Sequence, residues 1–282
     1  MSAKKMLVTA LIAAIDAGQA ILDVYRTDFD VIKKEDKSPL TLADQCSHKI
    51  IFNSLSPFNI PILSEEGKAI AYEKRKKWKR LWIIDPLDGT KEFVKRNDEF
   101  TVNIALVEDQ RPKIGIIYLP VKDALYFAEK QLGAFRIDNA KIIINRLKLK
   151  LEKENSVFHS TLISKAQLLP IKNLSRPIFT IVGSRSHGTP ELEDFVNKKQ
   201  KTLGKVQFIS AGSSLKICLV AEGRADIYPR LGPTMEWDTA AGQAIAEFAG
   251  ARMAEYKTRK PLIYNKEDLL NPWFVVEWKQ NS

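Results

Sequence analysis

One stretch of this chain, WIIDPLDGT at residues 82–90, joins an apolar segment to a turn that carries two carboxylates. The apolar segment predicts a buried strand, which we expect to end at Pro86 because proline cannot donate a hydrogen bond to a sheet ladder. Asp85, Asp88 and the carbonyl of Leu87 can then face one small volume, and such oxygen ligands suit magnesium. Taken alone, however, the same residues also make a good surface turn.

Further residues can supply oxygen ligands for the metal and N–H groups that bind phosphate around this turn. Glu65 follows a short apolar strand, and Asp238 precedes the helix predicted at 239–248, where an N-cap role is the alternative. Clustered carboxylates raise one another's pKa, so a bound cation is the natural compensation. The backbone N–H groups of Gly89 and Thr90 can bind a phosphate at the start of the next segment. Together these residues predict a magnesium-dependent phosphatase.

Hydrophobic periodicity divides the chain into two parts near residue 150. The first part begins with two helices, one at 5–26 and one that starts near Thr41. The strands predicted after them are 60–63, 81–84, 102–107, 114–118 and 147–151, the last from leucines that alternate with lysines. In the second part, the strands 178–182 and 206–210 alternate with the helices 191–198, 214–222 and 239–248, and Gly223 and Gly250 end the last two helices. This order indicates an α+β or α/β protein with domains at 1–150 and 151–282.

Composition and charge restrict the partners. The chain has 282 residues, 45% hydrophobic and 28% charged, which is typical of a globular protein, and its net charge of +10 favours anionic partners. The densest basic run, at 74–80, is interpreted as a solvated helical face. Because no nucleic-acid-binding motif accompanies it, a nucleic-acid partner is not expected. A weak peripheral contact with a membrane surface stays open.

The N-terminal segment and the cysteines favour a cytoplasmic location. Asp16 interrupts the first apolar stretch and no cleavage pattern follows, so we expect an amphipathic helix in place of a signal peptide. No window is expected to be long and apolar enough to cross a membrane. Cys46 and Cys218 are far apart and are expected to be free buried thiols, and no zinc-ligand spacing is present.

Four separated segments together resemble the lithium-sensitive, magnesium-dependent phosphatases of the inositol monophosphatase superfamily. They are SPLTLAD at 38–44, SEE at 64–66, WIIDPLDGT at 82–90 and WDTAAG at 237–242. The resemblance covers nearly the whole chain and implies a layered α-β-α-β-α sandwich of the inositol monophosphatase and fructose-1,6-bisphosphatase type. It implies most metal ligands and an antiparallel sheet at 1–150, and the nucleotide contacts and the last metal ligand at 151–282.

Three other segments resemble the bacterial 3′(2′),5′-bisphosphate nucleotidase branch of this superfamily. They are KEFVKRNDEFTVN at 91–103, GSSLKICLVAEG at 212–223 and YPRLGPT at 228–234. The branch hydrolyses 3′-phosphoadenosine 5′-phosphate, a by-product of sulfate assimilation, to AMP and phosphate. The phosphate that is not cleaved needs cationic contacts, which Lys216 and Arg230 can supply, although both would otherwise be taken as surface charges. The alternatives are an inositol or broad sugar phosphatase, and a non-catalytic binder of nucleic acid or membranes.

The resemblance also implies individual roles. Asp44 and Thr90 match the catalytic positions that orient and deprotonate the attacking water. The metal ligands, for two to three magnesium ions, would be Glu65, Asp85, the Leu87 carbonyl, Asp88 and Asp238. The substrate contacts would be Glu65, Gly89, Thr90, Ser184, His187, Gly212, Ser213, Lys216, Arg230 and Asp238. The residues leave open the preference for a 3′ or 2′ phosphate, activity on the sulfated nucleotide, the number of ions bound at rest, and the roles of the run 74–80 and of Glu236. The residues also leave the oligomeric state open, with a monomer slightly favoured.

Overall fold

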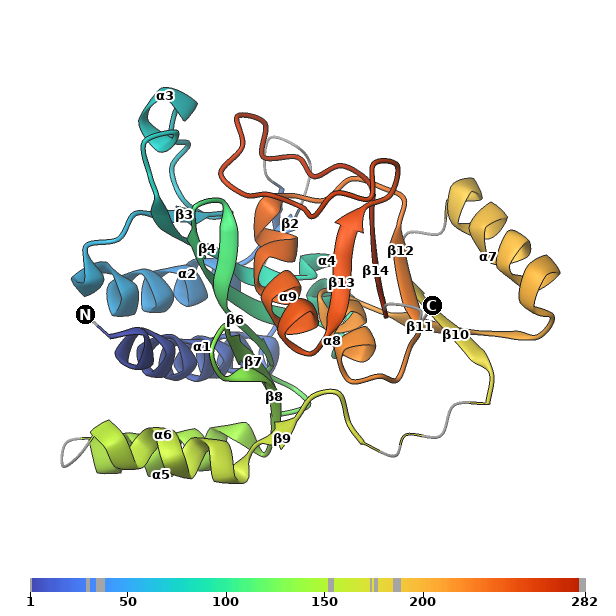
Figure 1. Ribbon diagram of the computed structural model, residues 1–282. Helices are drawn as coiled ribbons and strands as arrows, with labels where there is room; N and C mark the ends of the chain where they lie inside the picture. Colours follow the sequence, from blue (N-terminus) through green and yellow to red (C-terminus); the bar gives the residue numbers. More distant parts are fainter. Residues whose placement is uncertain are drawn as a thin grey trace.

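The computed structural model describes residues 2–28, 31–33, 39–151, 155–172, 174, 177–184 and 189–278 (Figure 1). Its helices are α1 Ala3–Tyr25, α2 Leu42–Leu55, the 3-10 helix η1 Ser56–Phe58, α3 Tyr72–Arg75, α4 Thr90–Val94, α5 Ala140–Leu151, α6 Asn155–Lys165, α7 Pro190–Leu203, α8 Leu215–Ala221 and α9 Glu236–Phe248. Its strands are β1 Ile32–Lys33, β2 Pro39–Leu40, β3 Ile62–Ser64, β4 Arg80–Asp88, β5 Thr101–Glu108, β6 Arg111–Leu119, β7 Ala124–Glu129, β8 Gly133–Asp138, β9 Gln167–Leu168, β10 Phe179–Ser184, β11 Val206–Ala211, β12 Ile227–Arg230, β13 Ala251–Glu255 and β14 Phe274–Trp278.

Two sheets organise these elements. The seven-stranded sheet has the order β3-β4-β5-β6-β7-β8-β9, and its pairs are antiparallel except for β3 with β4. The five-stranded sheet has the order β11-β10-β12-β14-β13, in which β10 pairs in parallel with both neighbours and β14 pairs antiparallel with both of its own. Strands β1 and β2 form a separate antiparallel pair.

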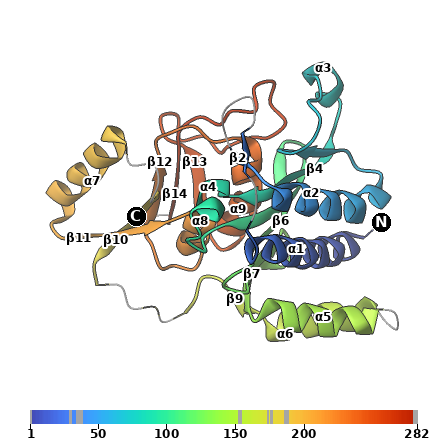
Figure 2. The ribbon, with the colours of Figure 1, turned by 180° about the vertical axis from the view of Figure 1, so that it is seen from behind.

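Helices and sheets alternate in five layers. Helices α1, α2, α5 and α6 cover one face of the seven-stranded sheet, α8 and α9 lie between the two sheets, and α7 lies beyond the five-stranded sheet (Figures 1 and 2). Successive side chains of β4 serve the two cores on its opposite faces. Trp82 packs in the core that contains Leu11 of α1, and Ile83 packs in the core that contains Ala241 of α9. The predicted layered sandwich is confirmed.

Helix α9 approaches the seven-stranded sheet so closely that β6 requires a glycine. A Cβ atom at Gly115 would lie 2.3 Å from the carbonyl oxygen of Ala241. Any residue other than glycine at this position would therefore clash with the helix. The small side chains of Ala240, Ala241 and Ala244, all buried, let the helix come this near. As a result, the carboxylate of Asp238 in the first turn of α9 lies close to that of Asp85 on β4.

Helix α1 is a core helix, although its 23 residues also have the length and composition of a membrane span. The expectation that no window of the chain reaches that length was therefore wrong. The buried residues of this helix are Met6, Leu7, Val8, Ala10, Leu11, Ala13, Ala14, Ile15, Ala17, Gly18 and Ile21. Asp16 lies on its exposed side and pairs with Lys148 at 2.8 Å. Packing against the sheet thus accounts for the apolar composition.

The strand predicted at 147–151 is wrong, because these residues continue helix α5. Ala140, Ile144 and Leu147 are buried together, and their spacing is that of one helical face. The alternation of leucine and lysine extends over too few residues to distinguish a strand from the end of an amphipathic helix.

Strand β4 also differs from the prediction, since it continues through Pro86 to Asp88. Its pairing with β5 shifts between Asp85, which is opposite Asn103, and Asp88, which is opposite Thr101. The shift leaves one extra residue on β4, as in a β-bulge, so the missing N–H of Pro86 breaks no regular ladder. Both carboxylates are therefore carried by a strand of the central sheet.

The other predicted elements are confirmed to within a few residues. They are the helices at 5–26, from Thr41, 191–198, 214–222 and 239–248, and the strands at 60–63, 81–84, 102–107, 114–118, 178–182 and 206–210. Gly223 and Gly250 follow α8 and α9 with φ of 84° and 101°, the left-handed conformation that ends helices. Cys218 is a buried free thiol, and Cys46 is free but only half-buried. The seven-stranded sheet takes β9 from beyond residue 150, and the domain boundary near that residue stays a prediction.

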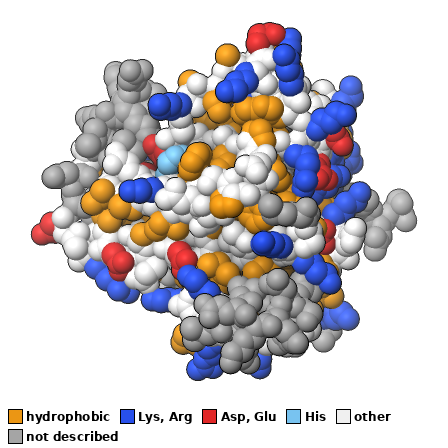
Figure 3. Space-filling view, turned by 90° about the vertical axis from the view of Figure 1, so that its left-hand side faces the viewer, with side chains coloured by type: hydrophobic (Ala, Val, Ile, Leu, Met, Phe, Trp, Pro, Cys, Tyr) orange, Lys and Arg blue, Asp and Glu red, His pale blue; other side chains and the backbone are white. Residues whose placement is uncertain are grey.

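The basic run 74–80 is not a single solvated helical face, because α3 ends at Arg75 and this residue is buried. Its guanidinium donates hydrogen bonds to the side chain of Asn265 and to the backbone carbonyls of Ile70, Lys266 and Glu267. Figure 3, a view of the left-hand side of Figure 1, shows lysine and arginine side chains scattered among acidic and hydrophobic ones. Arg75 thus fastens a distant segment of the chain to α3.

Candidate active site

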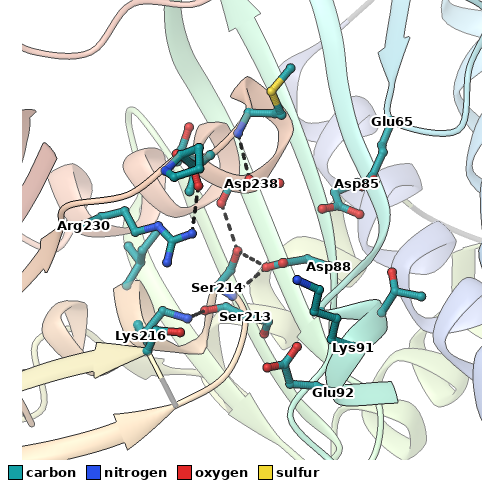
Figure 4. Close-up of a pocket in the computed structure, with 18 of the residues that line it drawn as sticks. Glu65, Asp85, Asp88, Lys91, Glu92, Ser213, Ser214, Lys216, Arg230 and Asp238 are labelled. Atoms are coloured by element: carbon teal, nitrogen blue, oxygen red, sulfur yellow. Dashed lines mark hydrogen bonds between the residues drawn. The ribbon is translucent and has the colours of Figure 1, made fainter. Parts of the chain in front are cut away.

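A cavity of about 380 Å³ opens where the seven-stranded sheet, β12 and the N-terminal ends of α8 and α9 meet. It contains residues that the sequence predicted from both halves of the chain. Those that line it are Glu65, Asp85, Leu87, Asp88, Gly89, Thr90, Ser184, Ser213, Lys216, Arg230 and Asp238. Figure 4 shows Glu65 and Asp85 on one side of this pocket and Arg230 and Lys216 on the other, with Asp88 and Asp238 between them.

Three carboxylates from three different elements converge in the pocket. Glu65 follows β3, Asp85 belongs to β4, and Asp238 belongs to α9, and each offers an oxygen within 4.8 Å of the other two. Asp238 is not the N-cap of α9, as the alternative interpretation had it. The N-cap is Met235, whose N–H donates to Asp238 Oδ2 at 2.8 Å. The carboxylate of Asp238 therefore stabilises the start of the helix and also faces Glu65 and Asp85.

The electrostatics of this group fit a divalent cation. Burial, and then the charges of Glu65, Asp88 and Asp238, raise the pKa of Asp85 well above its usual value. Burial, followed by the charge of Asp88, raises the pKa of Asp238 to about 8. The Oδ2 atom of Asp85 is buried and has no hydrogen-bond partner among the described residues. A magnesium ion would offset the repulsion between the carboxylates, and Oδ2 of Asp85 could then act as one of its ligands.

We expect magnesium to stabilise the protein more at about pH 8 than at about pH 6, because a bound ion displaces protons from its ligands. The pKa of Asp238 is about 8 in the folded protein, whereas an unfolded aspartate titrates near about 3.9. The metal-free fold therefore loses stability as the pH rises through about 4 to about 8, and the ion offsets that loss.

Calorimetric unfolding with and without magnesium at both pH values measures this difference. Asp238→Asn should reduce the pH dependence, of which Asp85 supplies the remainder, while Asp194→Asn, on the exposed side of α7, should leave it unchanged. An equal rise of the unfolding midpoint at the two pH values would contradict the assignment of Asp238.

The predicted catalytic residues Asp44 and Thr90 lie within hydrogen-bonding distance of each other. Asp44 is buried, and its Oδ2 atom accepts hydrogen bonds from the N–H of Thr41 at 2.8 Å and the hydroxyl of Thr41 at 2.6 Å. The Thr90 hydroxyl lies 3.4 Å from Asp44 Oδ1 and 3.3 Å from the carbonyl oxygen of Leu87. The fold therefore holds the Asp44 carboxylate in one orientation, with Oδ1 directed at the hydroxyl of Thr90.

The opposite side of the pocket is cationic. Lys216 is 5% exposed, and burial lowers its pKa to about 8, although the charge of Asp88 acts in the other direction. Its Nζ atom donates to the carbonyl of Ser213 at 2.6 Å and lies 5.6 Å from the centre of the Tyr228 ring. Arg230 donates to the carbonyl of Pro233 at 2.8 Å. Lys216 is therefore not the solvated surface charge that its sequence context alone suggested, whereas Arg230 is half-buried in the cavity wall.

Two polar atoms on this side also lack a hydrogen-bond partner in the described part of the chain. They are the hydroxyl oxygen of Ser213 and Nε of Arg230, and both are buried. Ser213 has a left-handed backbone with φ of 43°. Buried polar groups are normally paired, so these atoms indicate where a polar ligand binds.

Three more predicted substrate contacts have different outcomes: Gly89, Gly212 and His187. Gly89 caps the short helix α4 with φ of 89° and lines the cavity, so its conformation requires glycine. Gly212 does not line the cavity, because its N–H donates to the buried Glu99 at 2.7 Å and braces the turn from below. His187 lies outside the described residues.

The sequence interpretation missed the residues that support the site. Ser214 and Asn103 hydrogen-bond to Asp88, although each contact joins segments far apart in the chain. Asn103 is the one polar side chain between Val102 and Val107 of the apolar strand β5, and that isolation was the available signal. Ser214 had no signal beyond its place next to Ser213.

Glu236, whose role was left open, fastens the segment that closes one edge of the cavity. This residue is buried, and its carboxylate accepts the N–H of Asn265 at 2.6 Å, the N–H of Lys266 at 2.9 Å and the ammonium of Lys266 at 2.6 Å. Arg75 holds Asn265 from the other side at 3.0 Å. The same segment contributes Leu270 to the cavity wall, so Glu236 supports the pocket without lining it.

Comparison with known proteins places this chain among well-defined relatives. The sequence model of the inositol monophosphatase family matches residues 2–279. The Shigella flexneri protein named 3′(2′),5′-bisphosphate nucleotidase CysQ is 42% identical over 93% of this chain and 96% of its own length. The protein of the same name from Escherichia coli K12 is 41% identical with the same coverage.

Solved structures agree with this grouping. The crystal structure of CysQ from Bacteroides thetaiotaomicron, described as a bacterial member of the inositol monophosphatase family, is 48% identical, covers 99% of both chains and has a TM-score of 0.88. The extragenic suppressor protein SuhB from Bartonella henselae, at 24% identity, shares the fold with a TM-score of 0.70 over 99% of this chain.

Proposed function

The chain belongs to the inositol monophosphatase family, and on that premise we propose that it is a magnesium-dependent 3′(2′),5′-bisphosphate nucleotidase. Its substrate is 3′-phosphoadenosine 5′-phosphate, and its products are AMP and phosphate. One observation supports this choice above an inositol or sugar phosphatase. The same cavity has an acidic side, suited to metal ions and the phosphate to be cleaved, and a separate cationic side formed by the buried Lys216 and the half-buried Arg230, suited to a second phosphate.

The metal ligands in this proposal are Glu65, Asp85, the carbonyl of Leu87, Asp88 and Asp238, for two to three ions. When bound, magnesium neutralises phosphate charge and makes a water molecule more acidic, as in other metal-dependent phosphatases. The convergence of Glu65, Asp85 and Asp238 within 4.8 Å supports this set. The unpartnered Oδ2 of Asp85 supports it independently.

Asp44 and Thr90 act on the attacking water. The water would donate a hydrogen bond to the hydroxyl oxygen of Thr90, whose own proton is directed to Asp44. The two hydrogen bonds from Thr41 keep Asp44 from turning away. The water is thereby held in line with the bond to be broken, and positioning of this kind dominates phosphoryl transfer.

Lys216, Arg230 and Ser213 bind the phosphate that is not cleaved. Arg230 offers a planar fork that suits two phosphate oxygens, and the buried Lys216 adds a second positive charge. The unpartnered Ser213 hydroxyl and Arg230 Nε gain partners when this phosphate is present. A substrate with one phosphate leaves these groups unpaired, which disfavours it.

In this proposal the ribose lies between the acidic and the cationic side of the cavity, and the base enters an adjoining space. Ser184 lines both the main cavity and an adjoining one of about 150 Å³, which also includes Tyr228, Arg230 and Pro233. This second space, with apolar walls from Leu192 and Leu231, is suited to a base. His187 and Gly89 complete the proposed contacts, the former on the strength of the family resemblance alone.

A cytoplasmic location, lithium sensitivity and a role in sulfate assimilation belong to the same proposal and are supported by the family resemblance. We also propose that the protein is a monomer. The test of the proposal is a substrate panel of 3′-phosphoadenosine 5′-phosphate, inositol 1-phosphate and fructose 1,6-bisphosphate with magnesium. We expect kcat/KM to be highest for the nucleotide by at least about a hundredfold, the discrimination that unpaired buried polar groups provide. A preference for the inositol ester would refute the substrate.

A further inference from the structure

Ser214 holds Asp88 with two hydrogen bonds from one residue. The backbone N–H and the hydroxyl of Ser214 each lie 2.7 Å from Oδ2 of Asp88. Ser214 is the N-cap of α8 and is 3% exposed, whereas Asp88 ends β4 in the other half of the chain. The contact therefore joins a carboxylate of the seven-stranded sheet to the helix layer between the sheets (Figure 4).

The surrounding polar groups determine the direction of these hydrogen bonds. Thr101 donates its hydroxyl proton to Asn103 Oδ1 at 3.0 Å, which leaves the two amide protons of Asn103 for other acceptors. One goes to the hydroxyl oxygen of Ser214 at 2.9 Å and the other to Asp88 Oδ2 at 3.3 Å. The Ser214 hydroxyl has one proton and two acceptors, Asp88 Oδ2 at 2.7 Å and the carbonyl of Asp238 at 3.0 Å, and the shorter contact to the charged carboxylate is favoured.

The donors of Ser214 and Asn103 all reach the same oxygen of Asp88, Oδ2, and Thr101 Oγ1 lies 3.4 Å from it. With Oδ2 occupied by Ser214 and Asn103, the other oxygen, Oδ1, is the one left to face the cavity that Asp88 lines. Ser214 Oγ also lies 3.0 Å from the backbone carbonyl of Asp238. The same hydroxyl thus contacts the residues that carry two of the converging carboxylates.

We propose that Ser214, oriented by Asn103, is a positioning residue that fixes Asp88 relative to Asp238 and thereby sets the affinity of the site for magnesium. This inference rests on the proposed function, since it takes Asp88 and Asp238 as metal ligands. Residues that orient metal ligands in this way change metal affinity by about 10–100-fold when they are removed. Without the Ser214 hydroxyl, Asp88 loses its shortest side-chain donor and keeps the backbone N–H of Ser214 and the longer contact from Asn103, so it is held less firmly toward the ion.

The test is titration calorimetry of the full chain with magnesium chloride, without substrate. Ser214→Ala should bind magnesium about 10–100-fold more weakly than the wild type. Asn103→Ala should weaken binding in the same direction, and the two changes together should cost less than their sum, because Asn103 and the Ser214 hydroxyl contact each other and bind the same oxygen of Asp88. Ser214→Thr, which keeps the hydroxyl, should restore most of the affinity. Ser164→Ala is the matched control, since this exposed serine bonds only the carbonyl of Thr161.

A merely structural role for Ser214 predicts a different pattern. Ser214→Ala would then lower the unfolding midpoint of the metal-free protein while its magnesium affinity stayed that of the wild type, and this result would overturn the inference. Wild-type protein that binds no magnesium would instead overturn the proposed function. If Ser214→Ala fails to fold, Asn103→Ala tests the hydrogen bonds that Ser214 and Asn103 together make around Asp88: unchanged magnesium affinity in that variant rejects the positioning role, and weakened affinity supports it.

Discussion

Asp88→Asn is expected to lower kcat on 3′-phosphoadenosine 5′-phosphate by about a thousandfold, which corresponds to about 4 kcal/mol of lost transition-state stabilisation. The substitution replaces a carboxylate oxygen in the pocket with a neutral amide. Because the asparagine oxygen can still accept the hydrogen bonds of Ser214, we expect little loss of fold. Initial rates at saturating magnesium and calorimetric unfolding measure the two effects separately.

Asp194→Asn is the matched control for this prediction, since Asp194 is exposed on α7, beyond the five-stranded sheet. It should change neither the rate nor the unfolding midpoint. An Asp88→Asn variant with the full wild-type rate would refute the metal site as assigned. A variant that loses activity only because it unfolds would be recognised by its lowered midpoint without magnesium.

Arg230→Ala is expected to lower kcat/KM for 3′-phosphoadenosine 5′-phosphate by about thirtyfold, or about 2 kcal/mol, the usual size of a charged hydrogen bond. The rate on adenosine 3′-monophosphate, which lacks the second phosphate, should change little. Arg230 lies at the end of β12, and its guanidinium donates a hydrogen bond to the backbone carbonyl of Pro233 in a neighbouring loop, so its removal should leave the strand in place. Rates on the two nucleotides are compared side by side.

Arg230→Lys should give an intermediate loss on the bisphosphate, because lysine keeps the charge but not the planar fork. Arg146→Ala, at an exposed position of α5, serves as the control and should behave as the wild type. If Arg230→Ala slows both nucleotides equally, the cationic side of the cavity does not bind the second phosphate. The substrate would then have to be reconsidered within the family.

The sequence was informative about residues whose position follows from local structure. Glu65 and Asp85 could be placed because each lies at or near the end of an apolar strand, and the fold brings both to the cavity. The hydrophobic alternation of β5 and β6 likewise predicted strands that the structure contains. In these cases the pattern and the three-dimensional position depend on the same few neighbouring residues.

Features that depend on tertiary contacts could not be predicted in this way. Nothing near Ser214 indicates that it reaches Asp88, because the contact exists only once α8 packs against the end of β4. The burial of Arg75 is similar, since its partners belong to a segment near the C-terminus. Asp238 was displaced from an N-cap to the first turn of α9 because the helix starts earlier, at Glu236.

The wide separation of the three converging carboxylates along the chain has a consequence for biosynthesis. A ribosome completes Glu65 and Asp85 early, while Asp238 and the α9 helix that carries it are made near the end. Until α9 has emerged and docked between the sheets, the nascent chain holds two mutually repelling acids without the third ligand. On the proposed assignment, the complete set of magnesium ligands therefore forms only after α9 has been made and has docked, and a chain that stops before α9 lacks one of them.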